Sequence, residues 1–217
     1  MQSFFNPPTK TLTRQTAPLN LGNFSMPVPL CKIPDNSGYF LYFKLNDHPG
    51  LVEEAARLIS ERIHSLQLKH PYFVTPEAST LALAHVLRHK YQINGATLYK
   101  SQQLSDVDPI SVSYDTVTSL NKKTLFLGSN TAEEMNDKDI IIIDSVCTTG
   151  GTLQGVYELL LKAGISPQKI VEATLLFSEG TPRKTLDISP GNSLKLHCFG
   201  HLPLIAQPSA QAPSYNP

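Results

Sequence analysis

The residues best suited to chemistry follow the most apolar run of the chain. The run DIIIID ends at Asp144, and a loop of small and hydroxylated residues comes directly after it. Glycine lets a backbone turn and expose its N–H groups, threonine hydroxyls add donors, and a helix N-terminus supplies positive potential. A carboxylate beside such a loop accepts hydrogen bonds from sugar hydroxyls. The pattern predicts a site for a phosphate joined to a sugar, made of Asp144, Ser145, Val146, Cys147, Thr148, Thr149, Gly150, Gly151 and Thr152.

Two common nucleotide-binding motifs are missing from the sequence. No Gly-Lys-Ser/Thr follows the glycines, so the loop is not a Walker loop, and no GxGxxG occurs anywhere in the chain. The alternative interpretation is a tight turn between a strand and a helix, in which the threonines only cap the helix.

The elements that must position this loop alternate between strands and helices. Apolar or aromatic runs predict strands at residues 39–44, 72–75, 96–100, 110–117, 124–127, 139–144 and 169–177. Helical spacing predicts helices at 77–89 and 152–163, and another that starts near Pro49 and is capped by Asn46 or Asp47. The alternation predicts an α/β fold, with a mostly parallel central sheet and helices on both faces. Because residues 139–144 are apolar without alternation, they are expected to form a central strand.

The domain organisation follows from length and composition. A chain of 217 residues with 41% hydrophobic residues can build one sizeable domain, which we place at residues 26–205. Residues 1–25 show no periodicity and are expected to form a loose arm or part of a lid. Residues 206–217 are rich in proline and small residues and are expected to be disordered.

Charge and cysteine content exclude several classes of protein. Lys plus Arg equals Asp plus Glu, 18 each, which argues against a nucleic-acid-binding or anionic-membrane surface. The three cysteines lie far apart and fit no disulfide framework or metal-ligand pattern, so no protein metal site is expected. The sequence lacks a signal peptide and a long apolar span, and predicts a cytoplasmic protein.

The segment IIIIDSVCTTGGT at residues 140–152 resembles the signature with which type I phosphoribosyltransferases bind 5-phosphoribosyl 1-pyrophosphate (PRPP). The resemblance implies that fold, with a small lid (hood) element, and Mg²⁺ bound together with PRPP. It also implies that Asp144 holds the ribose hydroxyls while residues 148–152 wrap the 5′-phosphate. The family usually has a second acid where Ser145 stands, so part of the expected contact with ribose and Mg²⁺ is missing.

Two further stretches extend the resemblance to the adenine and xanthine members of this family. TPEASTLAL at residues 75–83 resembles their pyrophosphate loop and implies that Glu77, Ala78 and Ser79 meet the pyrophosphate. TLYKSQQL at residues 97–104 resembles the segment that carries an Arg-Lys pair, in which Lys100 matches the lysine and Tyr99 replaces the arginine. Without the resemblance, Glu77 would be an ordinary acid in the first turn of a helix and Lys100 a solvated lysine.

The remaining site residues are assigned by the same resemblance. Asp115 falls near the expected mobile catalytic loop and is a candidate catalytic acid beside Lys100 and Asp144; the alternative is a solvated loop acid. Phe43, Asn46 and Phe177 are candidate contacts of the base, and the alternatives are core residues or a helix cap. The segments ATLLFSEG and GHLPL, at 173–180 and 200–204, resemble the strands that wall the base site.

The function implied is transfer of the phosphoribosyl group of PRPP to adenine, giving AMP and pyrophosphate, by a homodimer. Xanthine, guanine or orotate is an alternative acceptor. A non-catalytic PRPP sensor is another alternative, because Ser145 and Tyr99 both remove charges that are usual in the family. An unrelated α/β nucleotide binder is a further one, which the missing motifs disfavour.

Overall fold

The centre of the molecule is a six-stranded sheet. The computed structural model describes residues 12–33, 38–106, 108–115, 122–189 and 191–206. In this sheet every neighbouring pair is parallel except the edge pair β10–β11, which confirms the predicted mostly parallel sheet. In spatial order the strands are β10 (Thr185–Ser189), β11 (Asn192–Leu202), β9 (Ile170–Glu179), β8 (Asp139–Cys147), β4 (Pro71–Pro76) and β5 (Gly95–Leu98).

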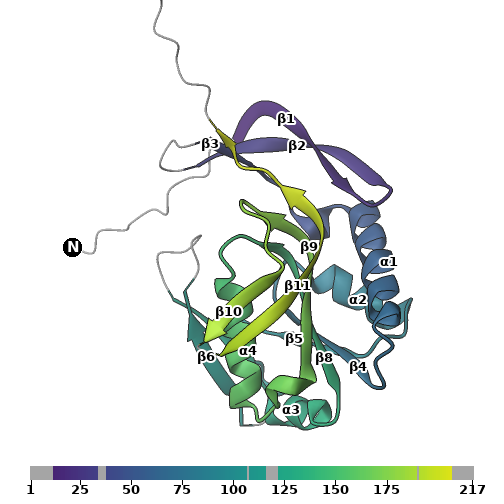
Figure 1. Cartoon of the computed structure of the whole chain (residues 1–217), viewed down its shortest axis with the longest axis vertical. Helices are drawn as coiled ribbons and strands as arrows, with labels where there is room; N and C mark the ends of the chain where they lie inside the picture. The colour runs from purple at the N-terminus through teal and green to yellow at the C-terminus, as the bar shows by residue number, and fades with distance from the viewer. Residues whose placement is uncertain (1–11, 34–37, 107, 116–121, 190, 207–217) are drawn as a thin grey trace, which may run out of the picture.

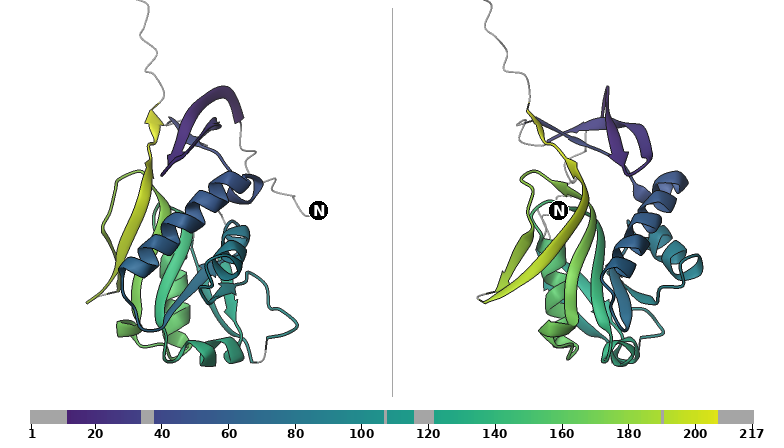
Figure 2. Two further views of the ribbon diagram at one scale, coloured as in Figure 1. Left: turned by 90° about the vertical axis from the view of Figure 1, so that its right-hand side faces the viewer. Right: turned by 45° about the vertical axis from the view of Figure 1, so that its right-hand side comes forward.

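Helices cover both faces of this sheet, as predicted (Figures 1 and 2). On one face lie α1 (Pro49–Ser65) and α2 (Leu81–His89), and on the other α3 (Ser129–Met135) and α4 (Gly151–Lys162). None of the helices within the described ranges has both the length and the apolarity to cross a bilayer.

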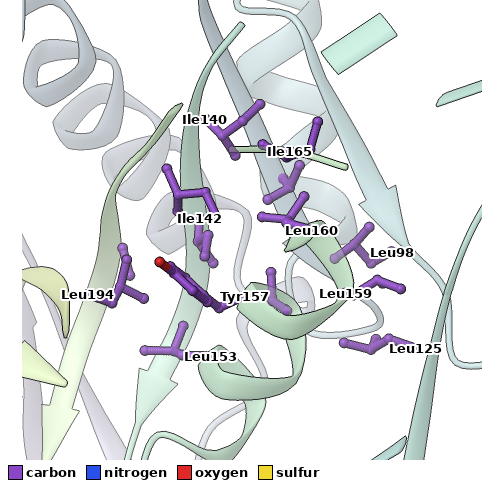
Figure 3. Packing of buried hydrophobic residues seen from close by; sticks show 14 of the residues in the cluster. Leu98, Leu125, Ile140, Ile142, Leu153, Tyr157, Leu159, Leu160, Ile165 and Leu194 are labelled. Atoms are coloured by element: carbon purple, nitrogen blue, oxygen red, sulfur yellow. The ribbon is translucent and has the colours of Figure 1, made fainter. Parts of the chain in front are cut away.

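The middle strand β8 explains the continuous apolar run. Its residues Ile140 and Ile142 pack into the cluster that contains α4, whereas Ile141 and Ile143 pack into the cluster that contains α1 and α2. Figure 3 shows Ile140 and Ile142 facing Tyr157 and Leu160 of α4. Because both faces of the strand are buried, no polar residue alternates along it.

A second, four-stranded sheet, the hood sheet, lies at one end of the molecule (Figure 1). It has the order β1 (Leu12–Leu21), β2 (Phe24–Lys32), β3 (Gly38–Leu41) and β12 (Ile205–Ala206). Within the range expected to be a loose arm or part of a lid, residues 12–21 therefore form a regular strand. Only Leu19 and Leu21 of β1 are buried, which explains why the sequence shows no periodicity there. The expected tail lies outside the described residues beyond Ala206.

Several predicted boundaries shift. The strand expected at residues 39–44 ends at Leu41 and is followed by the short 3-10 helix η1 (Leu45–Asp47), and the helix expected from residue 77 begins at Leu81. The predicted strand at 110–117 is observed as β6 (Ile110–Tyr114), which pairs with β7 (Lys123–Leu127); residues 116 and 117 lie outside the described ranges.

The predicted cap of α1 is wrong. The residue before the helix is His48, and no side chain caps this end. Asn46 instead donates from Nδ2 to the Ala78 carbonyl at 2.7 Å and accepts from the Ala82 N–H at 3.3 Å. The amide therefore ties η1 to the start of α2.

Candidate active site

A cavity of about 490 Å³ lies at the carboxyl end of β8. Parallel α/β sheets place their ligands at this edge. The cavity brings together all nine residues predicted for the sugar phosphate. It is lined by Phe40 to Asp47, by Ala78 and Ser79 from the turn after β4, by Asp144 to Leu153, and by Glu179 and Leu202.

The loop between β8 and α4 has the local geometry of an anion cradle. β8 ends at Cys147 and α4 begins at Gly151. Gly150 turns the chain with φ +93°, and a Cβ there would lie 2.7 Å from the Leu186 side chain. No side chain caps the N-terminus of α4. The free N–H groups of its first turn and the positive end of its dipole can therefore attract an anion bound at the loop.

Asp144 is a buried acid, with 7% of its surface exposed. Burial raises the pKa of its carboxyl group to about 6, although the Ser145 N–H, which donates to Oδ1 at 2.7 Å, and the charges of Lys100 and Lys123 oppose the rise. At neutral pH the group is mostly ionised but poorly solvated. Such a carboxylate accepts hydrogen bonds strongly from ligand hydroxyls.

Ser145, which stands where a second acid was expected, makes a specific contact in the structure. Ser145 Oγ lies 3.1 Å from Ser79 Oγ, so the two hydroxyls link the segment after Asp144 to the turn after β4. The segment beyond Asp144 is therefore attached to the predicted pyrophosphate loop by a neutral hydrogen bond.

The predicted pyrophosphate residues divide into two groups. Ala78 and Ser79 line the cavity. Glu77 does not; its carboxylate accepts from the Lys100 N–H at 3.1 Å, and its own N–H donates to the Leu98 carbonyl at 2.8 Å. Glu77 thus holds the segment that carries Lys100. The Lys100 side chain is exposed and, like Glu77, lies outside the cavity lining, although its positive charge lowers the pKa of Asp144.

The predicted base contacts also divide. Phe43 and Asn46 line the cavity. Phe177 is fully buried and is not part of the lining, so in this structure it is a core residue. Its ring meets that of Phe43 edge to face with centroids 5.6 Å apart, and it supports Phe43 from behind. Asp115 is exposed and lies outside the cavity lining.

The sequence of the site also identifies its family. The profile of the phosphoribosyl transferase domain matches residues 42–196, which include Asp144 and the whole loop. The chain belongs to the phosphoribosyl transferase family. No curated protein sequence matches this transferase significantly.

Solved structures of adenine phosphoribosyltransferases share the fold of this transferase. The enzyme from Thermoanaerobacter pseudethanolicus is 13% identical, with a TM-score of 0.61 over 80% of this chain and 95% of that one. The Giardia lamblia enzyme with 9-deazaadenine is 12% identical (TM-score 0.54; 86% and 93% covered). The Saccharomyces cerevisiae enzyme is 17% identical (0.56; 77% and 90%). Together with the family match, these similarities confirm the predicted type I fold.

Sequence analysis did not identify two charged residues that act at this site, Glu179 and Lys123. Glu179 lines the cavity and accepts from the Thr148 hydroxyl at 2.8 Å. The strand predicted at 169–177 continues to Glu179, and that extension would have placed the acid at the same sheet edge as Asp144. Lys123 acts on Asp144 from β7, outside the central sheet. No local pattern indicates its proximity.

Replacing Gly150 with alanine is expected to weaken both folding and ligand binding in the transferase. The positive φ costs an L-residue roughly 1–2 kcal/mol, and the contact with Leu186 adds to this. Gly164→Ala is the matched control, because Gly164 has φ +86° but nothing within 4 Å of its added Cβ. Urea unfolding and ribose 5-phosphate calorimetry should show both variants destabilised and only Gly150→Ala impaired in binding. Equal effects of the two variants on both measurements would contradict the close fit at Gly150.

Proposed function

We propose that this transferase moves the phosphoribosyl group of PRPP to a purine, with adenine as the first candidate. The observation that carries the proposal is that the buried Asp144 and the loop at residues 148–152 line one cavity. The acid suits ribose hydroxyls and the cradle suits the 5′-phosphate. Both ends of one sugar phosphate are thereby matched.

The proposed reaction is displacement at the anomeric carbon of PRPP. A purine ring nitrogen forms the new C–N bond, the C–O bond to pyrophosphate breaks, and the proton of the purine nitrogen is released to solvent. Positive charge develops on the sugar ring while negative charge develops on the leaving group. In this proposal Asp144 holds the ribose hydroxyls close to the first charge. The resemblance assigns the second charge to Lys100, which lies outside the cavity lining but whose charge acts on Asp144. The protein contributes positioning and electrostatics, without a covalent nucleophile.

Mg²⁺ fits the site as a companion of the substrate. In the described ranges no three His, Cys, Asp or Glu side chains gather into a metal cage. Magnesium in phosphate sites is commonly held by substrate oxygens, waters and one or two carboxylates. Asp144 is a suitable carboxylate on the cavity wall. When bound, the ion neutralises charge on the pyrophosphate.

The choice of adenine rests on the fold and on the base side of the cavity. Phe43 offers an aromatic surface for a flat ring, and Leu202 adds apolar surface. The named structural neighbours are adenine enzymes, and the Giardia lamblia enzyme was solved with 9-deazaadenine. Xanthine, guanine and orotate are the competing acceptors.

The proposal also includes the cytoplasmic location and the homodimer implied by the resemblance. Light scattering of the purified protein checks the assembly.

The test is pyrophosphate release from PRPP and Mg²⁺ with adenine, hypoxanthine, guanine, xanthine and orotate in turn. We expect turnover with adenine and little with the others. Calorimetry with PRPP alone separates binding from chemistry. Turnover with another base alone would overturn the choice of adenine, and PRPP binding without turnover by any base would overturn the proposed reaction.

A further inference from the structure

The end of β9 and the segment after it contact the loop between β8 and α4 at two successive threonines. Glu179, the last residue of β9, accepts from the Thr148 hydroxyl at 2.8 Å. Arg183 donates from Nη1 to the Thr149 carbonyl at 3.2 Å. Nothing in the sequence pattern assigns Arg183 a role. Its guanidinium is exposed and has no ion pair with a carboxylate in the described part of the chain.

Arg183 contacts the Thr149–Gly150 peptide without being part of the cavity lining. Thr149 and Gly150 both line the cavity, whereas Arg183 does not. The Thr149–Gly150 peptide is trans, and in a trans peptide the C=O and N–H bonds point in opposite directions. Because the Thr149 carbonyl points to Arg183, the Gly150 N–H of the same peptide points away from Arg183.

We propose that Arg183 is a positioning residue, which holds this peptide so that the Gly150 N–H is presented to the 5′-phosphate of the bound sugar. A hydrogen bond from a guanidinium is charge-assisted and polarises the peptide that accepts it. The N–H on the other side becomes a better donor to an anion. Glycine lets residue 150 adopt φ +93°, but it has no side chain that could fix the orientation of the peptide before it. This inference rests on the proposed function, since it assumes that the cradle binds a phosphate.

The chemistry of the contact separates positioning from direct attraction. Positioning needs an N–H donor that reaches the Thr149 carbonyl, and glutamine supplies one without charge. Direct attraction of the phosphate needs the positive charge, which lysine keeps and glutamine lacks. Lys184, one residue further on and also exposed, offers the matched control, because its removal changes the net charge equally.

The experiment is calorimetry of the full chain with ribose 5-phosphate and, separately, with inorganic pyrophosphate. Arg183→Ala is expected to weaken ribose 5-phosphate binding about tenfold, the effect of losing one charge-assisted hydrogen bond, and to leave pyrophosphate binding unchanged. Arg183→Gln should recover most of the affinity, and Lys184→Ala should bind like the wild type. A Gly150 amide proton that shifts downfield when ribose 5-phosphate binds, and does so less in Arg183→Ala, would report the peptide directly by NMR.

Three results would overturn the inference. They are an unchanged affinity in Arg183→Ala, an Arg183→Gln protein as weak as Arg183→Ala, or a Gly150 amide shift that is the same in all variants. If the wild type itself fails to bind ribose 5-phosphate and PRPP, the proposed function fails and the inference fails with it. If the wild type and Arg183→Ala bind ribose 5-phosphate equally well, only the proposed role of Arg183 is contradicted.

Discussion

An Asp144→Asn protein is expected to be more stable than the wild type at neutral pH and to lose nearly all turnover. Under the proposed function, replacement of the carboxylate removes charge-assisted hydrogen bonds to the ribose hydroxyls, worth about 1.5–3 kcal/mol each, so kcat/KM should fall roughly 10²- to 10⁴-fold. The gain in stability has a separate origin. Ionised Asp144 is buried in the protein, and an amide of the same shape avoids that cost.

The pH dependence of the stability gain follows from the direction of the pKa shift. The pKa of Asp144 is about 6 in the folded protein and near its ordinary value of 3.8 when unfolded. Between these values the folded state binds more protons, so wild-type stability falls as pH rises and then levels off above the folded pKa. Two pKa units correspond to about 3 kcal/mol. The difference between Asp144→Asn and wild type should therefore grow from near zero in acid to its full size above neutrality.

Asp139→Asn, on the same strand, is the control of opposite sign. Burial raises the pKa of Asp139, but the hydrogen bond from the His70 N–H and the charge of Lys169 outweigh it and the net pKa is lowered. This variant should lose stability relative to wild type as pH rises through the acid range. Urea unfolding of both variants across that range is the measurement. A pH-independent difference for Asp144→Asn would contradict a raised pKa at that residue.

Replacing Arg62 with methionine is expected to produce the largest loss of stability. Arg62 binds Glu172 through two hydrogen bonds of 2.9 and 2.7 Å, and the Glu172 side chain is 0% exposed. Removal of one partner of a buried pair leaves an uncompensated charge and costs about 3–5 kcal/mol. The remaining contacts from Lys195 at 3.5 Å and Thr174 at 3.1 Å compensate only partly, which places the expected loss near the lower figure. Thermal and urea unfolding measure it.

Two further variants identify the buried charge as the cause. Arg62→Met combined with Glu172→Gln should recover most of the lost stability. The exposed pair of Lys90 and Glu53 supplies the control, because solvent screens its charges and Lys90→Met should leave stability nearly unchanged. Burial raises the pKa of Glu172, but Arg62 outweighs burial and holds it lowered, so this contribution is lost as the wild type is acidified. The gap between wild type and Arg62→Met should therefore narrow at low pH; a constant gap would point to lost packing instead.

The parts of the site that are contiguous in sequence were predictable. Residues 144–152 carry their acid, hydroxyls and glycines in one run, so local chemistry indicated the loop that the cavity contains. Contacts across the fold were not predictable. Asn46 binds residues 78 and 82, and no local pattern distinguishes that role from a helix cap. Phe177 is an aromatic residue of the kind that lines base pockets, but the packing of β9 buries it fully.

The same distinction applies to the fold. Elements with a strong apolar signal, such as the continuous apolar run of β8 and the helical spacing of α4, were predicted within a few residues. β1 was not, because a strand of the hood sheet that exposes most of its side chains has no alternating pattern to detect. Its regular structure depends on pairing with β2. Elements stabilised by a neighbour rather than by their own sequence are the ones that sequence analysis misses.

The pairing of β12 with β3 sets an order of events during synthesis. Tyr39 leaves the ribosome early, whereas its partner Ile205 follows only after every strand of the central sheet has been made. The β1–β2 hairpin can form at once, since its two strands are close in sequence, but the last strand of the hood sheet must wait. β3 supplies Phe40 and Leu41 to the wall of the cavity. The pairing that completes the sheet behind this wall therefore forms only after all the strands of the central sheet have been synthesised.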